Sequence, residues 1–279
     1  SPTQALRFPF PRLPGRRGSN PNPQRAAMPA SPCIVAYEPD CDFPIENLPL
    51  GIFERPDQAG KRVGAAIGNQ VLDLACLWEM GALADLADVP PPDGSEFAAG
   101  SLNALMAHGG PLRRALRRRL QELLSPTGER SLAAAGGQAA LVPLSRARLH
   151  LPVAIGDYTD FYASRDHATN VGTMFRGADQ ALMPNWLHLP VGYHGRASSI
   201  VLSGSPVRRP VGQVKGAQDP SPRLAPTAEL DFELEVGAFI GVGNPLGSRI
   251  AAGAADEHVF GLVLVNDWSA RDIQRWEYQ

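Results

Sequence analysis

LDFELEVGAFIG, residues 230–241, alternates acidic and apolar side chains with the two-residue period of a β-strand. Successive side chains of a strand leave opposite faces, so Glu233, Glu235 and Asp231 share one face. Phe232, Leu234 and Val236 occupy the other face. The segment therefore predicts a strand that directs two glutamates at one cation, or that presents an acidic stripe to solvent opposite a core face.

Two further segments supply carboxylates. Asp160 stands in DYTDFY, and Asp267 ends the apolar run of VFGLVLVNDWS, residues 259–269, which predicts a second strand. At that place a carboxylate serves either as the cap of a following helix or as a ligand. With Glu233 and Glu235 there are four carboxylates from three places, and oxygen ligands favour hard cations such as Ca²⁺, Mg²⁺ and Mn²⁺ over zinc and copper.

Histidine, arginine and tyrosine accompany these acids. His167 lies in a segment too polar for a core strand, and a base near neutral pH beside a metal can activate water, although a lone histidine is more often structural. His188 and His194 are predicted to be structural. A rival iron site of two histidines and one carboxylate is disfavoured, because no two histidines have helical i, i+4 placement beside a carboxylate. Arg176 and Tyr193 suit recognition of a carboxylate, or are simple surface groups.

Composition narrows the class of protein. A chain of 279 residues suits about two domains, and a net charge of -2 gives no electrostatic argument for a nucleic-acid or membrane partner. No apolar run approaches the length of a membrane span. The three cysteines are an odd number without metal-type spacing, which favours reduced thiols in the cytosol. A small-molecule ligand fits these properties best.

The chain divides into three parts. Residues 1–39 are rich in proline and arginine, have no acidic residue before Glu38, and predict a disordered extension, or less readily an organelle transit peptide. Residues 40–150 predict a small β-rich unit with a hairpin at Gly68 and Asn69 and a helical insert. Residues 151–279 predict an antiparallel, barrel-like or rolled sheet with little helix. The fold class is mostly β, of the α+β type.

Local patterns refine this division. Leucines at helical spacing between residues 112 and 124 predict a helix, which Gly109, Gly110 and Pro111 separate from a shorter one before it. SSIVLSG at 198–204 predicts a strand, and the proline-containing residues 209–228 predict a surface loop. The longer helix carries arginines that either dock an anionic surface or form a solvated face. These are Arg113, Arg114, Arg117, Arg118 and Arg119.

Several blocks of sequence carry a family resemblance. They are DYTDFY at 157–162, RDHATNVG at 165–172, PNWLHLPVGYHGRASS at 184–199, DFELE at 231–235, NDWSARDIQRWEY at 266–278, and CDFPIENLPLGIF with VGAAIGNQVLDL in the first half. These blocks closely resemble the fumarylacetoacetase family, the fumarylacetoacetate hydrolases of tyrosine and phenylalanine breakdown. The resemblance spans the chain from about residue 40 to the end.

The resemblance implies a fold and an assembly. It implies a small SH3-like domain over residues 40–150, a β-roll catalytic domain over residues 151–279, and a cytoplasmic homodimer acting on a diketo-dicarboxylate. Family members have a lysine, a Gly-Thr-Thr turn and a glutamate beyond the matched part, so we expect a fragment that lacks the carboxyl-terminal part of the catalytic domain. An inactive cation-binding fragment is therefore an alternative of another class.

The resemblance also implies roles for individual residues. A Ca²⁺ or Mg²⁺ ion would be held by the four carboxylates, and His167 would be the base. Arg271 and Gln274 would face the developing oxyanion. Substrate contacts would come from Tyr162, Arg176, Tyr193, Gln274 and Tyr278. Acylpyruvate hydrolases and oxaloacetate decarboxylases have a similar architecture and are the runner-up, but they lack the PNWLHLPVGYHGR segment and the SH3-like domain.

Overall fold

The computed structural model describes residues 32–86, 89–133 and 136–277. The described residues form two compact units, one of residues 32–154 with 237–263 and one of residues 155–236 with 264–277. Most of the predicted disordered extension over residues 1–39 lies outside the described residues. Strands β10 (Leu230–Ile240) and β11 (Val259–Ala270) each pass from one unit into the other.

The first unit contains a five-stranded antiparallel sheet in the order β4-β3-β2-β1-β5. The strands are β1 (Leu50–Glu54), β2 (Lys61–Ile67), β3 (Gln70–Asp73), β4 (Leu141–Pro143) and β5 (Arg148–His150). The β2–β3 hairpin turns at Gly68 and Asn69 as predicted, and Gly68 has a φ of 55° that a side chain would disfavour. The sequence did not predict β4 or β5, because each is only three residues long.

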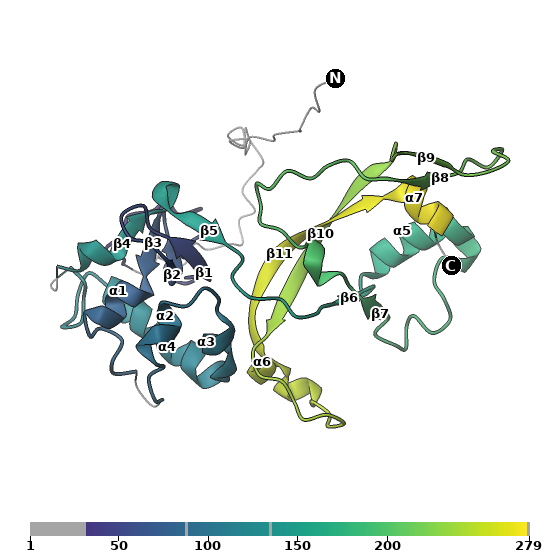
Figure 1. The fold of residues 1–279 in the computed structure, drawn as a ribbon. Coiled ribbons are helices and arrows are strands. Elements are labelled where there is room, and N and C mark those ends of the chain that lie inside the picture. The colour runs from purple at the N-terminus through teal and green to yellow at the C-terminus, as the bar shows by residue number, and fades with distance from the viewer. Residues whose placement is uncertain (1–31, 87–88, 134–135, 278–279) are drawn as a thin grey trace, which may run out of the picture. The chain divides into compact units, whose positions relative to one another are not determined.

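Helices accompany this sheet in the same unit (Figure 1). They are α1 (Leu74–Glu79), α2 (Gly94–Phe97), α3 (Asn103–Ala107), α4 (Gly109–Leu124) and α6 (Ala255–His258), with short 3₁₀ turns at Gly137–Ala140, Leu144–Arg146 and Ala252–Ala254. The predicted leucine stripe of α4 is buried, because Leu112, Leu116 and Leu120 are each 3% exposed or less. The glycines and proline at 109–111 form the first turn of α4, and only His108 separates it from α3.

The arginines of α4 mostly bind backbone carbonyl groups. Arg117 donates to the carbonyls of Glu46 and Asn47 at 2.8 Å, and Arg113 donates to those of Val259 and Phe260. Arg119 is buried and donates to the carbonyl of Asp85. Neither predicted alternative, a solvated face or a face that docks an anionic surface, applies to these three side chains. Each of them instead donates hydrogen bonds to backbone carbonyls of a neighbouring segment.

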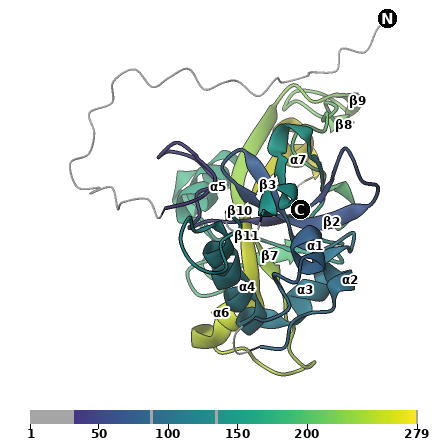
Figure 2. The same cartoon turned by 90° about the vertical axis from the view of Figure 1, so that its left-hand side faces the viewer.

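The second unit contains two two-stranded sheets, part of a third and two helices. The pairs are β6 (Thr159–Phe161) with β7 (Gly192–His194), β8 (Val211–Val214) with β9 (Arg223–Pro226), and β10 with β11. The helices are α5 (Arg165–Arg176) and α7 (Arg271–Glu277), with 3₁₀ turns at Ala178–Gln180 and Ala197–Ser199. β10 and β11 lie side by side in both views (Figure 1 and Figure 2).

Two predictions for this unit were wrong. Residues 198–204 form a 3₁₀ turn and irregular chain instead of a strand. Residues 209–228 contain the β8–β9 hairpin instead of a loop. Gly212 of β8 lies so close to Ile273 of α7 that an added Cβ would be 2.9 Å from its Cδ1, so this hairpin is stabilised by helix packing that its own sequence does not reveal.

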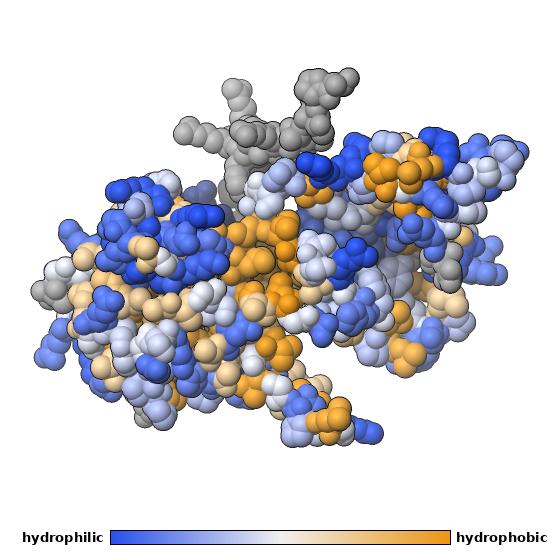
Figure 3. All heavy atoms as spheres, viewed as in Figure 1, coloured by the Kyte–Doolittle hydropathy of each residue, from blue (hydrophilic) through white to orange (hydrophobic). Residues whose placement is uncertain are grey.

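The exposure of the β10 side chains distinguishes between the two alternatives predicted for this strand. Phe232, Leu234 and Val236 are 63%, 75% and 67% exposed, whereas Glu233 and Glu235 are half-buried. Leu264 of β11 is likewise 78% exposed, and apolar surface is visible over these strands in Figure 3. The acidic face is therefore the inward one, which contradicts a solvent-facing acidic stripe opposite a core face.

The described residues thus have mixed helix and strand content and open sheets, with no closed barrel among them. Within the same ranges no helix is both long enough and apolar enough to cross a bilayer.

Asp73, at the end of β3, is a fully buried charge in the first unit. Its side chain caps α1 by accepting from the Cys76 amide, and it accepts from Arg62 at 3.0 Å and Arg55 at 3.1 Å. A buried carboxylate is tolerated when it is paired and fully hydrogen-bonded. Asp73 therefore joins the sheet, the first helix and two arginines into one network.

Asp73→Asn removes the charge that holds Arg55 and Arg62, and breaking a buried pair in this way costs about 3 kcal/mol. We expect a clearly lower urea midpoint by circular dichroism. The matched control is Asp57→Asn, because Asp57 is an exposed partner of the same Arg55. Equal midpoints for the two variants would contradict this account.

Candidate cation site

Three carboxylates converge in the second unit. Asp160 of β6, Glu235 of β10 and Asp267 of β11 each place one oxygen within 4.8 Å of the others, and all three are half-buried. Among the described residues this is the only group of three or more acidic, histidine or cysteine side chains close enough to share a metal. Asp267 lies within β11, four residues before α7, so its alternative assignment as the helix cap is wrong.

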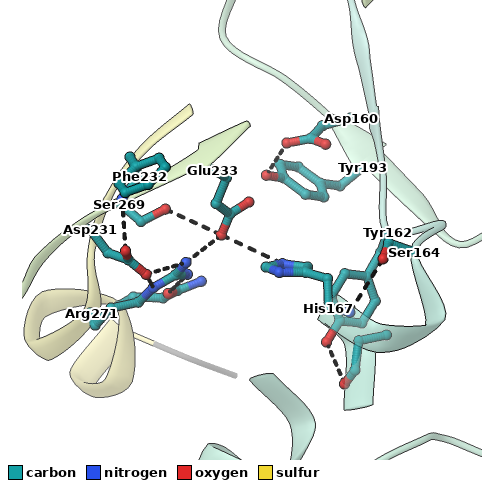
Figure 4. A network of polar contacts seen from close by, with 12 residues as sticks. Asp160, Tyr162, Ser164, His167, Tyr193, Asp231, Phe232, Glu233, Ser269 and Arg271 are labelled. Atoms are coloured by element: carbon teal, nitrogen blue, oxygen red, sulfur yellow. Dashed lines mark hydrogen bonds and ion pairs between the residues drawn. The ribbon is translucent and has the colours of Figure 1, made fainter. Parts of the chain in front are cut away.

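Pairing of β6 with β7 sets the position of Asp160. Asp160 and Tyr193 are direct cross-strand partners, and the Tyr193 hydroxyl donates to Asp160 Oδ2 at 2.5 Å. Figure 4 shows this pair beside Glu233. Two blocks of sequence about thirty residues apart are therefore joined by one strand pair, and Tyr193 orients a member of the carboxylate group.

Glu233 has different partners from Glu235. Its Oε1 accepts from Arg271 Nη2 at 2.5 Å and from Ser269 Oγ at 3.4 Å, and it lies 3.5 Å from His167 Nε2 (Figure 4). The predicted set of four carboxylates is thus divided, with three in one group and Glu233 linking an arginine to a histidine. Glu233 remains close to the group, because its charge adds to burial and to the charge of Asp160 in raising the pKa of both Glu235 and Asp267.

Helix α5 positions His167. Ser164 caps the helix by accepting from the His167 amide, so His167 stands in the first turn. The ring of Tyr162 packs edge-on against the His167 ring at 5.7 Å between centroids. The Tyr162 hydroxyl donates to the carbonyl of Ala168 in the same helix. Tyr162, predicted as a substrate contact, therefore supports the imidazole in this structure.

Helix α7 brings Arg271 and Gln274 together. Arg271 is buried, donates to Asp231 Oδ2 at 3.0 Å, and donates from Nη1 to Gln274 Oε1 at 3.0 Å. The start of the helix is held by the Arg271 amide, which donates to the Glu229 carbonyl, and by Asp272, which accepts from Thr227 and Ala228. The two residues expected to face an oxyanion are thus neighbours on one helix.

Other predicted residues lie elsewhere. Arg176, at the far end of α5, donates to the carbonyls of Gln180 and Ala181 at 3.1 and 2.6 Å and so holds the chain that follows the helix. His194 is exposed and lies 2.9 Å from Asp157. Tyr278 lies outside the described residues. His188 donates its amide to the Asn185 carbonyl, and the described three-residue metal group contains no histidine, which disfavours the rival iron site.

Sequence reasoning missed two residues at this site. Ser269 stands two positions after Asp267 on β11 and so shares its face, and it contacts Glu233. Tyr158 stands two positions before Asp160, and Gly195 packs directly against its ring. Burial raises the pKa of Tyr158, and the charges of Asp267 and Asp160 raise it further, which places the phenol beside the acids. The two-residue strand period was the signal that could have identified both.

The carboxylates repel one another. Burial, followed by the charges of Asp160 and Asp267, raises the pKa of Glu235 from 4.5 to about 7. Burial and then the charges of Asp160 and Glu233 also raise the pKa of Asp267. For Tyr193, burial and then its hydrogen bond to Asp160 raise the pKa. Each shift has the sign expected for acidic groups that lie close together in a partly buried site.

The donor set fits a hard divalent cation. Its ligand atoms are carboxylate oxygens, which Ca²⁺ and Mg²⁺ prefer, and a separation of up to 4.8 Å is compatible with two oxygens at about 2.0–2.6 Å from one ion. The arrangement is therefore a candidate oxygen-only cation site, with a histidine, an arginine and a glutamine in the residues around it.

The chain matches two family models in sequence order. Residues 46–152 match the fumarylacetoacetase N-terminal domain, and residues 157–279 match the fumarylacetoacetate (FAA) hydrolase C-terminal domain. Together with the relatives described next, these matches show that the chain belongs to the fumarylacetoacetase family.

Curated relatives named fumarylacetoacetase are similar over most of the chain. The bovine protein is 50% identical over 248 residues, the human protein 49% over 246, and that of Caenorhabditis elegans 48% over 250. Each match covers 88% of this chain and 58% of the relative. The chain therefore spans less than two thirds of the length of these relatives.

Cation affinity should rise with pH. Glu235 must lose its proton to bind, so we expect Ca²⁺ affinity to increase up to about tenfold per pH unit below about pH 7 and to level off above it. Calorimetric titration between about pH 6 and pH 8 measures this change and the proton released. Glu235→Gln should remove the dependence, and a wild-type affinity that is flat over the range would contradict the assignment.

Without a cation, the contribution of Glu235 to folding stability falls as pH rises, whereas the cation affinity increases. The folded-state pKa of Glu235 is raised above 4.5, so its contribution is fully present below about pH 4.5 and is lost as pH rises through about 7. Ca²⁺ should therefore raise the melting temperature more at pH 8 than at about pH 6.

Proposed function

We propose that this chain catalyses the hydrolysis of the carbon–carbon bond of 4-fumarylacetoacetate to fumarate and acetoacetate, the last step of tyrosine and phenylalanine breakdown. The supporting observation is that a chain of this family gathers Asp160, Glu235 and Asp267 into one group, with His167 close to the neighbouring Glu233. The bovine and human relatives, 50% and 49% identical to this chain over the matched residues, are named fumarylacetoacetase.

A cation is part of the proposal. Asp160, Glu235 and Asp267 would hold Ca²⁺ or Mg²⁺, with Glu233 as the fourth carboxylate ligand. When bound, the cation supplies positive charge beside the oxygens of the 1,3-diketone, where negative charge develops as the bond breaks. The same positive charge relieves the repulsion that raises the pKa of Glu235.

His167 is the proposed general base. It takes a proton from the water that attacks the carbonyl carbon of the fumaryl group. The bond from this carbon to the acetoacetyl CH₂ carbon breaks, and that CH₂ carbon takes up a proton to give acetoacetate. Glu233, 3.5 Å from His167 Nε2, orients the ring and stabilises its protonated form. The edge-on contact with Tyr162 further restricts the ring.

Arg271 and Gln274 are the proposed oxyanion partners. Their mutual hydrogen bond at 3.0 Å fixes both side chains before substrate binds, so that donors face the attacked carbonyl without further ordering. Arg176 and Tyr193 are proposed to bind a carboxylate of the substrate, and Tyr162, Gln274 and Tyr278 are proposed as further substrate contacts.

The finer fold assignments belong to the same proposal. Residues 40–150 form an SH3-like domain, and residues 151–279 belong to a β-roll that acts as a cytoplasmic homodimer. The five-stranded antiparallel sheet supports the first assignment. The paired strands β10 and β11 with an inward acidic face support the second.

The test is loss of diketone absorbance when the chain is incubated with fumarylacetoacetate and Ca²⁺ or Mg²⁺, with EDTA as the blank. His167→Ala should lower the rate at least about 100-fold, because it removes the general base. His194→Ala is the matched control, since His194 is exposed and pairs with Asp157. A His167→Ala protein with the wild-type rate would reject the assignment.

The same assay separates the alternatives. Acylpyruvates and oxaloacetate are supplied in parallel, and turnover of either in place of fumarylacetoacetate would assign the runner-up activity. A wild-type chain that binds the cation but hydrolyses none of the three is a cation-binding module without catalysis.

A further inference from the structure

The strands β10 and β11 contact helix α4 at the end of the pair that lies farthest from the candidate cation site, near Gly241 and Val259. The Gly241 amide donates to the His258 carbonyl at 2.8 Å, which closes the strand pair at this end. Arg113 Nη1 then donates to the carbonyls of Val259 and Phe260 at 2.8 and 3.0 Å. One side chain of α4 therefore satisfies two successive carbonyls where β11 begins.

Close packing reinforces this attachment. A Cβ added to Gly241 would lie 2.8 Å from the Met106 carbonyl oxygen, so the chain after β10 passes directly over the end of α3. A Cβ on Gly109 would lie 3.0 Å from Val242. The Arg114–Glu257 pair at 3.6 Å is exposed and adds little. The hydrogen bonds of Arg113 are thus the main polar contact.

The strand pair needs such support. Among the described residues β10 and β11 pair only with each other, and an isolated pair of strands is marginally stable in water. The outward face of this pair carries exposed side chains such as Leu234 and Leu264. The same two strands carry Glu235 and Asp267, whose mutual repulsion favours separation. Without an external restraint, the strands would relieve that repulsion by fraying or shifting.

We infer that Arg113 is a positioning residue that holds the carboxylate-bearing strands in place from their far end. The inference rests on the proposed cation site for its functional meaning. The arginines of α4 differ in role. Arg118 is exposed, whereas Arg113 and Arg117 donate to backbone carbonyls of neighbouring segments.

Two measurements on the whole chain test this inference. Calorimetry of Ca²⁺ binding reports the geometry of the carboxylates, and amide hydrogen exchange of residues 259–268 in EDTA reports the strands without any cation. Arg113→Met removes the hydrogen bonds but keeps much of the apolar stem. Arg118→Met is the matched control on the same helix, and Arg113→Lys retains donors for the two carbonyls.

Arg113→Met should weaken Ca²⁺ binding roughly tenfold. This is the lower end of the range of about 10–100-fold typical for the loss of a residue that supports metal ligands. The same variant should speed amide hydrogen exchange in β11. Arg118→Met should change neither quantity, and Arg113→Lys should restore part of both. Gly241→Ala is a second variant that acts from the strand side by pressing against Met106, and it should weaken binding in the same direction.

Wild-type affinity in the folded Arg113→Met protein overturns the inference, as does an equal loss in Arg118→Met. If Arg113→Met does not fold, the Arg113→Lys and Gly241→Ala proteins decide by the same two measurements. A third outcome separates the two proposals. If the wild-type chain binds no cation, the proposed function is contradicted. If the β11 amides nevertheless exchange faster in the Arg113→Met protein than in the wild type, the positioning role is still supported.

Discussion

Repulsion between carboxylates is the constraint on which the site depends. Asp160, Glu235 and Asp267 come from three strands that are far apart in sequence, yet their oxygens lie within 4.8 Å. Two like charges about 4 Å apart repel by about 4 kcal/mol at an effective dielectric near 20. Proton uptake by Glu235 or a bound cation relieves this repulsion, and strand pairing together with helix packing keeps the backbones from separating.

The sequence predicted that residues 230–241 form a strand, but it could not predict which face of that strand is buried. The alternation in 230–241 correctly predicts β10 and groups Glu233 with Glu235. It cannot say which face is inward, because that depends on what packs there, and here the acids are half-buried while Phe232 is exposed. The β8–β9 hairpin escaped prediction for a related reason, since Gly212 packs on α7 without an apolar pattern of its own.

The membership of the candidate site was predictable in part. Charge and spacing correctly indicated Asp160 and Asp267 as members of the carboxylate group. They could not distinguish Glu235, which belongs to that group, from Glu233, which binds Arg271. The difference arises from Arg271, whose position depends on where α7 begins. Helix α5 was missed although its Ser164 cap is a local signal of a helix start. The long-range contact of Arg271 with Glu233, in contrast, leaves no local signal in the sequence.

A crystal structure of the chain grown with Mn²⁺ tests the central claim most directly, because Mn²⁺ accepts the same oxygen ligands and gives an anomalous signal. We expect one strong anomalous peak about 2.0–2.6 Å from oxygens of Asp160, Glu235 and Asp267. A crystal in which these three side chains point apart, or in which the peak lies at other residues, would contradict it.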